Sequence, residues 1–246
     1  MKRMVMAGAM LLALGTGTAE AGLLSVGPAG AGGVQAFKTP PNSQAGAAPN
    51  DVIPSLWGYL NTYLYFKGDL GVQYEVKFTL VGSESSWTNQ LRETQGNKTL
   101  LETTDFGKTI SYLATGTGAD QLLKFQFETV AGDTSQPILV NGPAGGPGTI
   151  ANGGLGAPRT FFVSFCADKS VAPGLQKNLG CNTSGSPTTG NLAWLALDDS
   201  GAGPNDNHDD WVGLVEVKAV PDGGATLSLL GAALVGVGAI RRRFGA

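Results

Sequence analysis

Alternation of apolar and polar residues predicts β-strands in several parts of the chain. Between residues 72 and 80 every second side chain is large and apolar, and the residues between them are polar. The same period of two returns over residues 123–127, and a more fully apolar run covers residues 161–166. Because a period of two buries one face of a strand and exposes the other, we expect these segments to be core strands.

Two further apolar runs, residues 192–197 and 211–217, flank an acidic stretch and are expected to pair with each other. The turns between the predicted strands are rich in Gly and Pro, and the longest covers residues 141–158. No helical period of useful length precedes the C-terminal tail. Short strands separated by such turns predict an all-β fold, a single β-sandwich of jelly-roll type.

The sequence divides into four predicted parts. Residues 1–21 form a signal peptide, residues 51–219 form the β-sandwich, and residues 220–246 form a tail. The part between, residues 22–50, consists mostly of Gly, Ala, Pro, Ser and Gln, so burial cannot offset the entropy lost on ordering it. We therefore expect a flexible leader there, with one early strand at most.

The charge of the central part limits its partners. Once both ends are set aside, 11 basic and 17 acidic residues remain, a net charge of −6. Binding to phosphate groups needs clustered positive charge, so nucleic acid and anionic lipid are disfavoured as partners of this part. Cations are favoured instead.

The N-terminus has the three-part pattern of a secretory signal peptide. Lys2 and Arg3 precede an apolar run over residues 4–14, and small residues then lead to an A-x-A site at Ala19 and Ala21. Cleavage by signal peptidase is expected after Ala21. The alternative is a retained N-terminal membrane helix, but the run is too short to cross about 30 Å of hydrocarbon.

The C-terminus resembles a membrane-spanning segment with a cytoplasmic charge cluster. Sixteen residues without a charge, 225–240, would form a helix of about 24 Å, which spans a locally thinned bilayer. The residues that frame it are Val220, Pro221, Asp222, Gly223, Gly224, Arg241, Arg242 and Arg243. The arginines should stay in the cytoplasm, which places the preceding domain outside. A buried core helix is the alternative, although it would need no arginine triplet.

This order of V-P-D-G-G, apolar helix and R-R-R resembles the PEP-CTERM sorting tail in its V-P-D variant. The usual Pro-Glu-Pro is replaced here by Pro221-Asp222-Gly223. The resemblance implies that a membrane exosortase recognises the tail and cleaves near Val220 and Pro221. The domain would then be released or re-anchored. A protein that simply keeps its membrane helix is the alternative.

The only two cysteines, Cys166 and Cys181, predict one disulfide in an exported chain. It would close a Gly-rich loop of about 15 residues and contribute about 3 kcal/mol by restricting the unfolded chain. Two unpaired thiols are the alternative. A zinc or redox site is less favoured, because there is no C-x-x-C motif and His208 is the only histidine.

The acidic stretch 198–210 is the candidate metal site. It holds five carboxylates within thirteen residues, and these repel one another unless they are solvated or share a cation. Calcium takes six to eight oxygen ligands, and we expect Asp198, Asp206, Asn207 and Asp210 to supply them. The stretch is not an EF-hand, but it resembles the Asp/Asn-rich loop of other exported β-domains with this tail. A solvent-exposed acidic hairpin turn is the alternative.

Catalysis is not expected. His208 lies near Asp206 and Asp210 in sequence, but any acidic turn offers that arrangement. The chain has no G-x-S-x-G, H-E-x-x-H or P-loop pattern. Two opposed carboxylates would suffice for a glycosidase, so an enzyme acting on sugars stays an alternative. Trp87, in a polar turn after a strand, is a candidate for stacking on a sugar, or else it covers the edge of the sandwich.

Together these patterns predict a non-enzymatic, exported protein of the cell surface or extracellular matrix. Its processing partners would be signal peptidase and an exosortase, and its expected ligands are calcium and exopolysaccharide, with no nucleic acid. It would be anchored in the inner membrane, transiently or permanently, before reaching the surface. The alternatives are a secreted carbohydrate-active enzyme on a β-sandwich and an unprocessed single-span membrane protein.

Overall fold

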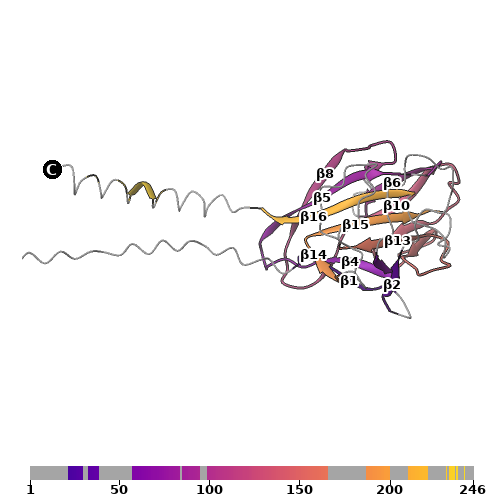
Figure 1. The fold of residues 1–246 in the computed structure, drawn as a ribbon, viewed down its shortest axis with the longest axis horizontal. Coiled ribbons are helices and arrows are strands. Elements are labelled where there is room, and N and C mark those ends of the chain that lie inside the picture. The colour runs from indigo at the N-terminus through magenta and orange to yellow at the C-terminus, as the bar shows by residue number, and fades with distance from the viewer. Residues whose placement is uncertain are drawn as a thin grey trace, which may run out of the picture.

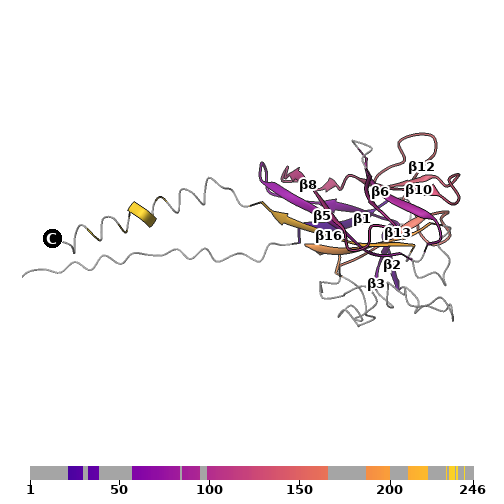
Figure 2. The ribbon, with the colours of Figure 1, turned by 90° about the horizontal axis from the view of Figure 1, so that it is seen from above.

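A computed structural model describes residues 22–29, 33–38, 57–83, 85–94, 99–165, 187–199 and 210–220, with isolated helical positions at 231, 233–235, 237 and 241. The described part contains sixteen β-strands arranged in three sheets, seen from two directions in Figures 1 and 2. The prediction of an all-β fold is therefore confirmed.

The largest sheet has seven strands, and every pairing in it is antiparallel. Its strands, in spatial order, are β2 (Gln35–Lys38), β3 (Trp57–Leu60), β13 (Thr160–Ser164), β15 (Leu192–Asp198), β16 (Trp211–Ala219), β5 (Gln73–Gly82) and β8 (Thr109–Thr115). The two runs predicted to pair around the acidic stretch are β15 and β16, which are neighbours over six residue pairs.

Two smaller sheets complete the described architecture. One has the order β14 (Thr189–Gly190), β1 (Leu24–Pro28), β4 (Thr62–Phe66) and β9 (Gln121–Leu122). The other has the order β12 (Thr149–Ala151), β11 (Ile138–Val140), β10 (Phe125–Ala131), β6 (Thr88–Glu93) and β7 (Thr99–Glu102). Among the pairings of the described strands, β11 with β12 is the parallel one.

The alternation read from the sequence explains how β5 is placed. Tyr74, Val76, Phe78 and Leu80 are buried, whereas the polar residues between them are partly exposed. Successive side chains of a strand point to opposite faces, so one face of β5 enters the core. The neighbouring edge strand β8 follows the same rule, with exposed and half-buried residues in turn.

The main core joins all three sheets. Its buried residues include Leu24 from the first small sheet, Phe127 from the second and Phe78 from the large sheet. Aromatic rings contact one another across the layers, since the ring centroids of Phe78 and Phe125 lie 5.9 Å apart and those of Phe127 and Trp211 lie 5.2 Å apart. Burial of each such side chain contributes about 1.5–3 kcal/mol relative to exposure, which holds the layers together as a sandwich.

A second, smaller apolar cluster lies on the opposite face of the large sheet. It contains Phe162, Trp194 and Val212, whose sequence neighbours on the same strands belong to the main core. The large sheet is thus apolar on both faces at β13 and β15. This explains why β13 and β15 read as continuous apolar runs rather than alternating ones.

The early part of the chain differs from the prediction. Residues 22–50 were expected to be a flexible leader with one strand at most, yet β1 and β2 both lie in that range. β1 pairs with β4 over five residue pairs, and Leu24 is fully buried. Two leucines in a segment of small residues are enough to anchor β1, because neighbouring strands supply backbone partners. The leader prediction is wrong for these residues.

The strand directions define two opposite ends of the molecule, called here the tail end and the acidic end. At the tail end lie the last residues of β16 and the first residues of β1 and β5, as the pairings of β5 with β16 and of β1 with β4 require. At the opposite, acidic end lie the last residue of β15 and the first of β16. Nine residues of β16 separate the two ends by about 30 Å at 3.3 Å per residue. Figure 2 shows β6, β10 and β12 at the acidic end, away from the point where β16 ends.

Candidate functional site

The acidic end brings together two of the four predicted calcium ligands. Asp198 is the last residue of β15 and is fully buried, and Asp210 directly precedes β16. The backbone N–H of Asp210 donates to the carbonyl of Leu197 at 3.1 Å, which keeps the two strands in register at the base of the loop. The other two predicted ligands, Asp206 and Asn207, lie outside the described residues, as does His208.

Asp199, which the sequence did not single out, organises this end. Its Oδ2 accepts hydrogen bonds from Ser85 Oγ at 2.6 Å and from Asn89 Nδ2 at 2.5 Å. Its own backbone N–H donates to Oδ2 of Asp210 at 2.8 Å. Asn89 belongs to β6 of the five-stranded sheet, so this buried carboxylate connects two sheets and fixes the start of the acidic loop.

A fully buried arginine provides the positive charge of the acidic end. Arg159 precedes β13 and donates from Nη1 to the carbonyl of Pro137 at 2.8 Å and from Nη2 to Oδ1 of Asn89 at 3.4 Å. Burial lowers the pKa of Arg159, and the nearby carboxylates of Asp199, Asp210 and Asp198 act in the opposite direction. A guanidinium stays charged at neutral pH, so Arg159 is a cation among the carboxylates of Asp199, Asp210, Asp198 and Glu128.

Arg159 was not predictable as a site residue. It stands alone after a Gly- and Pro-rich stretch, in no motif, and its role comes only from the fold. The described residues contain no group of three or more His, Cys, Asp or Glu side chains arranged to hold a metal ion. A calcium site at this end would therefore need oxygen ligands from residues 200–209, which include Asp206 and Asn207.

Trp87 contacts the turn that follows β10. It is partly buried, and its backbone N–H donates to Ser85 Oγ at 3.0 Å. A Cβ added to Gly132, which has a φ of 99°, would lie 2.2 Å from Cδ1 of Trp87, so the indole sits directly on the glycine backbone. This contact supports the alternative in which Trp87 covers the sandwich edge. Stacking of Trp87 on a sugar remains a prediction.

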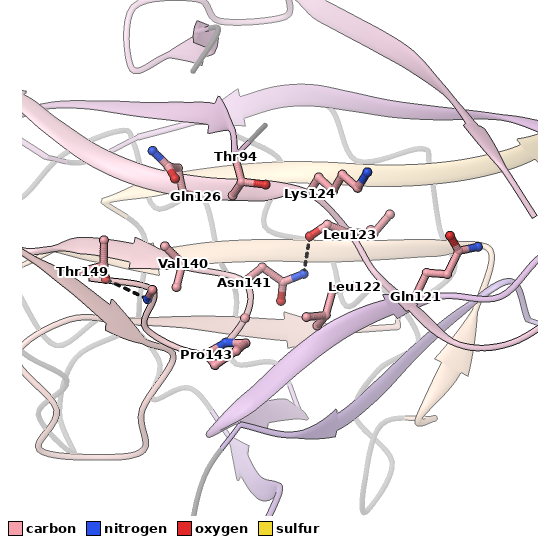
Figure 3. A pocket seen from close by; sticks show the side chains of 12 residues that line it. Thr94, Gln121, Leu122, Leu123, Lys124, Gln126, Val140, Asn141, Pro143 and Thr149 are labelled. Atoms are coloured by element: carbon pink, nitrogen blue, oxygen red, sulfur yellow. Dashed lines mark hydrogen bonds between the residues drawn. The ribbon is translucent and has the colours of Figure 1, made fainter. Parts of the chain in front are cut away.

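An open pocket of about 500 Å³ lies between β9, β10 and the loop after β11. In Figure 3, Thr94, Lys124 and Gln126 lie along one side of it and Pro143 lies opposite. Asn141 at its floor is structural, because its Nδ2 donates to the carbonyls of Leu64 and Leu123 at 2.8 Å each. The described lining residues include no carboxylate, so the pocket offers hydrogen bonds to a polar ligand but no acid–base pair.

At the tail end of the molecule, the first and last residues of the exported part lie close together. Asn191 accepts a hydrogen bond from Leu23 N through Oδ1 at 2.7 Å and another from Val217 N through its carbonyl at 3.0 Å. Gly22, the residue after the predicted signal-peptide cleavage site, packs so closely on Gly190 that a Cβ there would lie 2.4 Å from its backbone nitrogen. The chain therefore enters and leaves the sandwich at one place.

The sorting tail begins where the last strand stops. Val220 N donates to the carbonyl of Gln73 at 2.9 Å, and this is one residue past the end of β16. Beyond it, residues 231, 233–235, 237 and 241 are helical. Within the described part of the chain, no helix is both long and apolar enough to cross a membrane.

Several predicted features fall outside the described residues. These are the signal peptide with Ala19 and Ala21, the disulfide between Cys166 and Cys181, and most of the tail, including Pro221, Asp222, Gly223, Gly224, Arg242 and Arg243. They remain predictions.

Comparison with known proteins gives information on the tail alone. No curated protein and no solved structure matches the chain. Residues 219–244 match the family model of the VPDSG-CTERM motif. This chain has Gly223 where the motif's name carries Ser. The match confirms the prediction of a PEP-CTERM-like sorting signal, and it indicates a protein exported toward the cell surface or extracellular space.

Proposed function

We propose that this protein is exported as a membrane-inserted precursor and is processed by an exosortase close to Val220 and Pro221. Residues 225–240 would cross the inner membrane, and the arginines at 241–243 would hold the C-terminus in the cytoplasm. The observation that carries the proposal is the position of the motif match, which starts at residue 219, the last residue of β16. Cleavage after Val220 would leave every described strand intact.

Intact-mass measurement of the protein extracted from the cell surface tests this proposal. We expect a species that lacks the residues after the cleavage site. Replacement of Arg241, Arg242 and Arg243 by Gln should make the full-length precursor accumulate. A surface protein that retains the complete tail would instead establish the permanently anchored alternative. A reporter enzyme fused ahead of Pro221 supplies the topology control, because it must be active outside the cytoplasm.

For the exported domain we propose a non-enzymatic β-sandwich of jelly-roll type that binds calcium at its acidic end. The support is the position of Asp198 and Asp210 at the two ends of the acidic stretch, which the pairing of β15 with β16 brings together. The sequence of residues 200–209 contains further oxygen ligands, among them Asp206 and Asn207. Calcium would take oxygens from Asp198, Asp206, Asn207 and Asp210.

Thermal unfolding with and without calcium tests the metal proposal. A ligand that binds only the folded state increases the free energy of unfolding by RT ln(1 + [L]/Kd), which raises the melting temperature. We expect the rise in the unaltered protein and its loss in the Asp206→Asn, Asn207→Ala double variant. Asp69→Asn, an exposed carboxylate at the tail end, is the matched control and should keep the rise. An unaltered protein with equal melting temperatures in calcium and in chelator would disprove the site.

We also propose that the pocket in Figure 3 binds exopolysaccharide, supported by its polar rim of Thr94, Gln121 and Gln126. Retention on immobilised polysaccharides should fall when Gln126 becomes Ala and stay unchanged when Gln136, outside the pocket, becomes Ala. The alternative of a carbohydrate-active enzyme makes a different prediction. It requires hydrolysis of a polysaccharide that is lost when a single acidic residue becomes Asn or Gln.

A further inference from the structure

The turn between β4 and β5 holds two apolar side chains in solvent at the tail end. Leu70 is 80% exposed and Val72 is 37% exposed, with Gly71 between them at a φ of 80°. The turn is closed by a hydrogen bond of 3.1 Å from Val72 N to the carbonyl of Asp69. Leu70 is the most exposed large apolar residue of the described chain.

The neighbouring loop keeps this turn in a fixed shape. Gly71 N donates to the carbonyl of Gly116 at 2.9 Å, and Gly116 N donates to the carbonyl of Val72 at 2.8 Å. A Cβ on Gly116 would lie 2.2 Å from the carbonyl oxygen of Asp69, so the two loops are in close backbone contact. The apolar side chains are thus displayed by a rigid backbone, and they do not fold back onto the core.

The sorting tail leaves the sandwich next to this turn. Val220 N is bonded to the carbonyl of Gln73, the residue that follows Val72. Only five peptide units separate Val220 from Ala225, where the uncharged segment begins, so they reach about 17 Å at most. While the tail is in the bilayer, Val220 is therefore held within that reach of the lipid surface, and the turn that holds Leu70 lies beside Val220.

The N-terminal segment of the described chain lies on the same side of the sandwich. Lys67 N, at the start of the same loop, donates to the carbonyl of Leu23 at 2.8 Å, so the segment after the predicted signal-peptide cleavage site is also here. The charged side chains near the turn have both signs, Lys67 beside Asp69 and Lys218 paired with Glu216 at 3.1 Å. A net positive patch is not formed, which suits an uncharged lipid surface and apolar insertion better than binding to anionic headgroups.

We infer that the Leu70–Gly71–Val72 turn docks into the outer surface of the phospholipid bilayer while the precursor is anchored. This inference rests on the proposed membrane insertion of the tail. Apolar side chains of surface-bound segments enter 5–10 Å into the boundary between headgroups and acyl chains, which is the depth that one exposed leucine on a turn reaches. The turn thereby fixes the orientation of the sandwich and presents the V-P-D segment at the membrane face.

Fluorescence quenching on the full-length chain in zwitterionic liposomes tests the inference. An environment-sensitive fluorescent amino acid is placed at residue 70, at residue 155 or at residue 233, and quenching by lipids with a shallow nitroxide is compared. Leu155 is the matched control, because it is 47% exposed but belongs to the loop that pairs with Asn61 at the opposite end. We expect quenching at residue 70 to exceed that at residue 155 by about two-fold or more.

The label at residue 233 separates the two proposals. Strong quenching at 233 with equal, weak quenching at 70 and 155 would overturn the docking inference and leave the membrane insertion of the tail intact. Absence of quenching at 233 would overturn both. Quenching at 233 and 70, but not at 155, supports both.

A substitution provides an independent measurement. Replacing Leu70 and Val72 together by Ser should move a label at Thr117, in the contacting loop, out of range of the shallow quencher. Leu155→Ser should leave that label unchanged. If the label at Thr117 is quenched equally in the unaltered protein and in the double variant, the turn does not hold the domain at the lipid.

Discussion

Asn89 and Asp199 lie 110 positions apart in sequence, yet Nδ2 of Asn89 donates to Oδ2 of Asp199 at 2.5 Å in the protein interior. Oδ1 of Asn89 accepts in turn from Thr129 Oγ1 at 2.7 Å. One buried amide thus joins the five-stranded sheet to the end of β15. The contact holds the acidic loop against the sandwich.

Asn89→Ala should lower the free energy of unfolding by about 1–3 kcal/mol, because it leaves the buried carboxylate of Asp199 with one donor fewer. Urea unfolding of the unaltered and variant proteins measures this change. Ser86→Ala, at an exposed residue just before β6, should change stability by less than about 0.5 kcal/mol. Equal destabilisation by both variants would show that the amide contact is unimportant.

Arg159→Met should destabilise the domain by about 3–5 kcal/mol, since it removes the only cation buried among three carboxylates of the described acidic end. Combining it with Asp199→Asn should cost less than the sum of the two single changes, because the second change removes a charge that has lost its partner. Denaturant midpoints of all four proteins give the coupling free energy. Additive effects would contradict an interaction between the two residues.

Tyr112 should make the domain sensitive to alkali. Burial raises the pKa of Tyr112 to about 12, so the folded state retains a proton that the unfolded state loses near pH 10. The contribution of Tyr112 to the free energy of unfolding is complete below pH 10. It is lost as the pH rises through 12, a change of about 2–3 kcal/mol. Tyr112→Phe keeps the ring that stacks on Phe78 at 6.2 Å but cannot ionise. The variant should lose less stability than the unaltered protein between pH 10 and 12, measured by chemical unfolding.

Asp105 should contribute to stability at neutral pH but not in acid. The side chain of Lys108 and the backbone N–H of Glu102 donate to its carboxylate, and the hydrogen bond from Lys108 is the main reason why the pKa of Asp105 is lowered. Because the pKa is lowered on folding, the stabilisation is complete when the pH is above the pKa of the unfolded state, about 3.9. It is lost as the pH falls through the pKa of the folded state. Asp105→Asn should cost up to about 1 kcal/mol at pH 7, and this cost should shrink as the pH falls below about 3.9. A cost that does not vary with pH would point to lost packing instead.

The strands were predictable where one face is buried and the other is exposed to solvent, as in β5. Apolar and polar residues then alternate along the sequence. The pairing of β15 with β16 was predictable because both flank one polar loop. The strand β1 was not predictable, since its segment consists mostly of small residues and its backbone partners come from β4, a separate part of the chain. For the acidic end, the sequence located Asp198 and Asp210 but missed Asp199, Asn89 and Arg159, whose roles arise from contacts between distant strands.

Because Asn191 binds residues next to both ends of the exported part, anything fused to either end of this domain would emerge from the same pole. A peptide grafted into the loop between β15 and β16 would instead lie at the far pole, about 30 Å from those two ends. The domain therefore offers sites for fusion and for insertion that are separated by the length of its last strand.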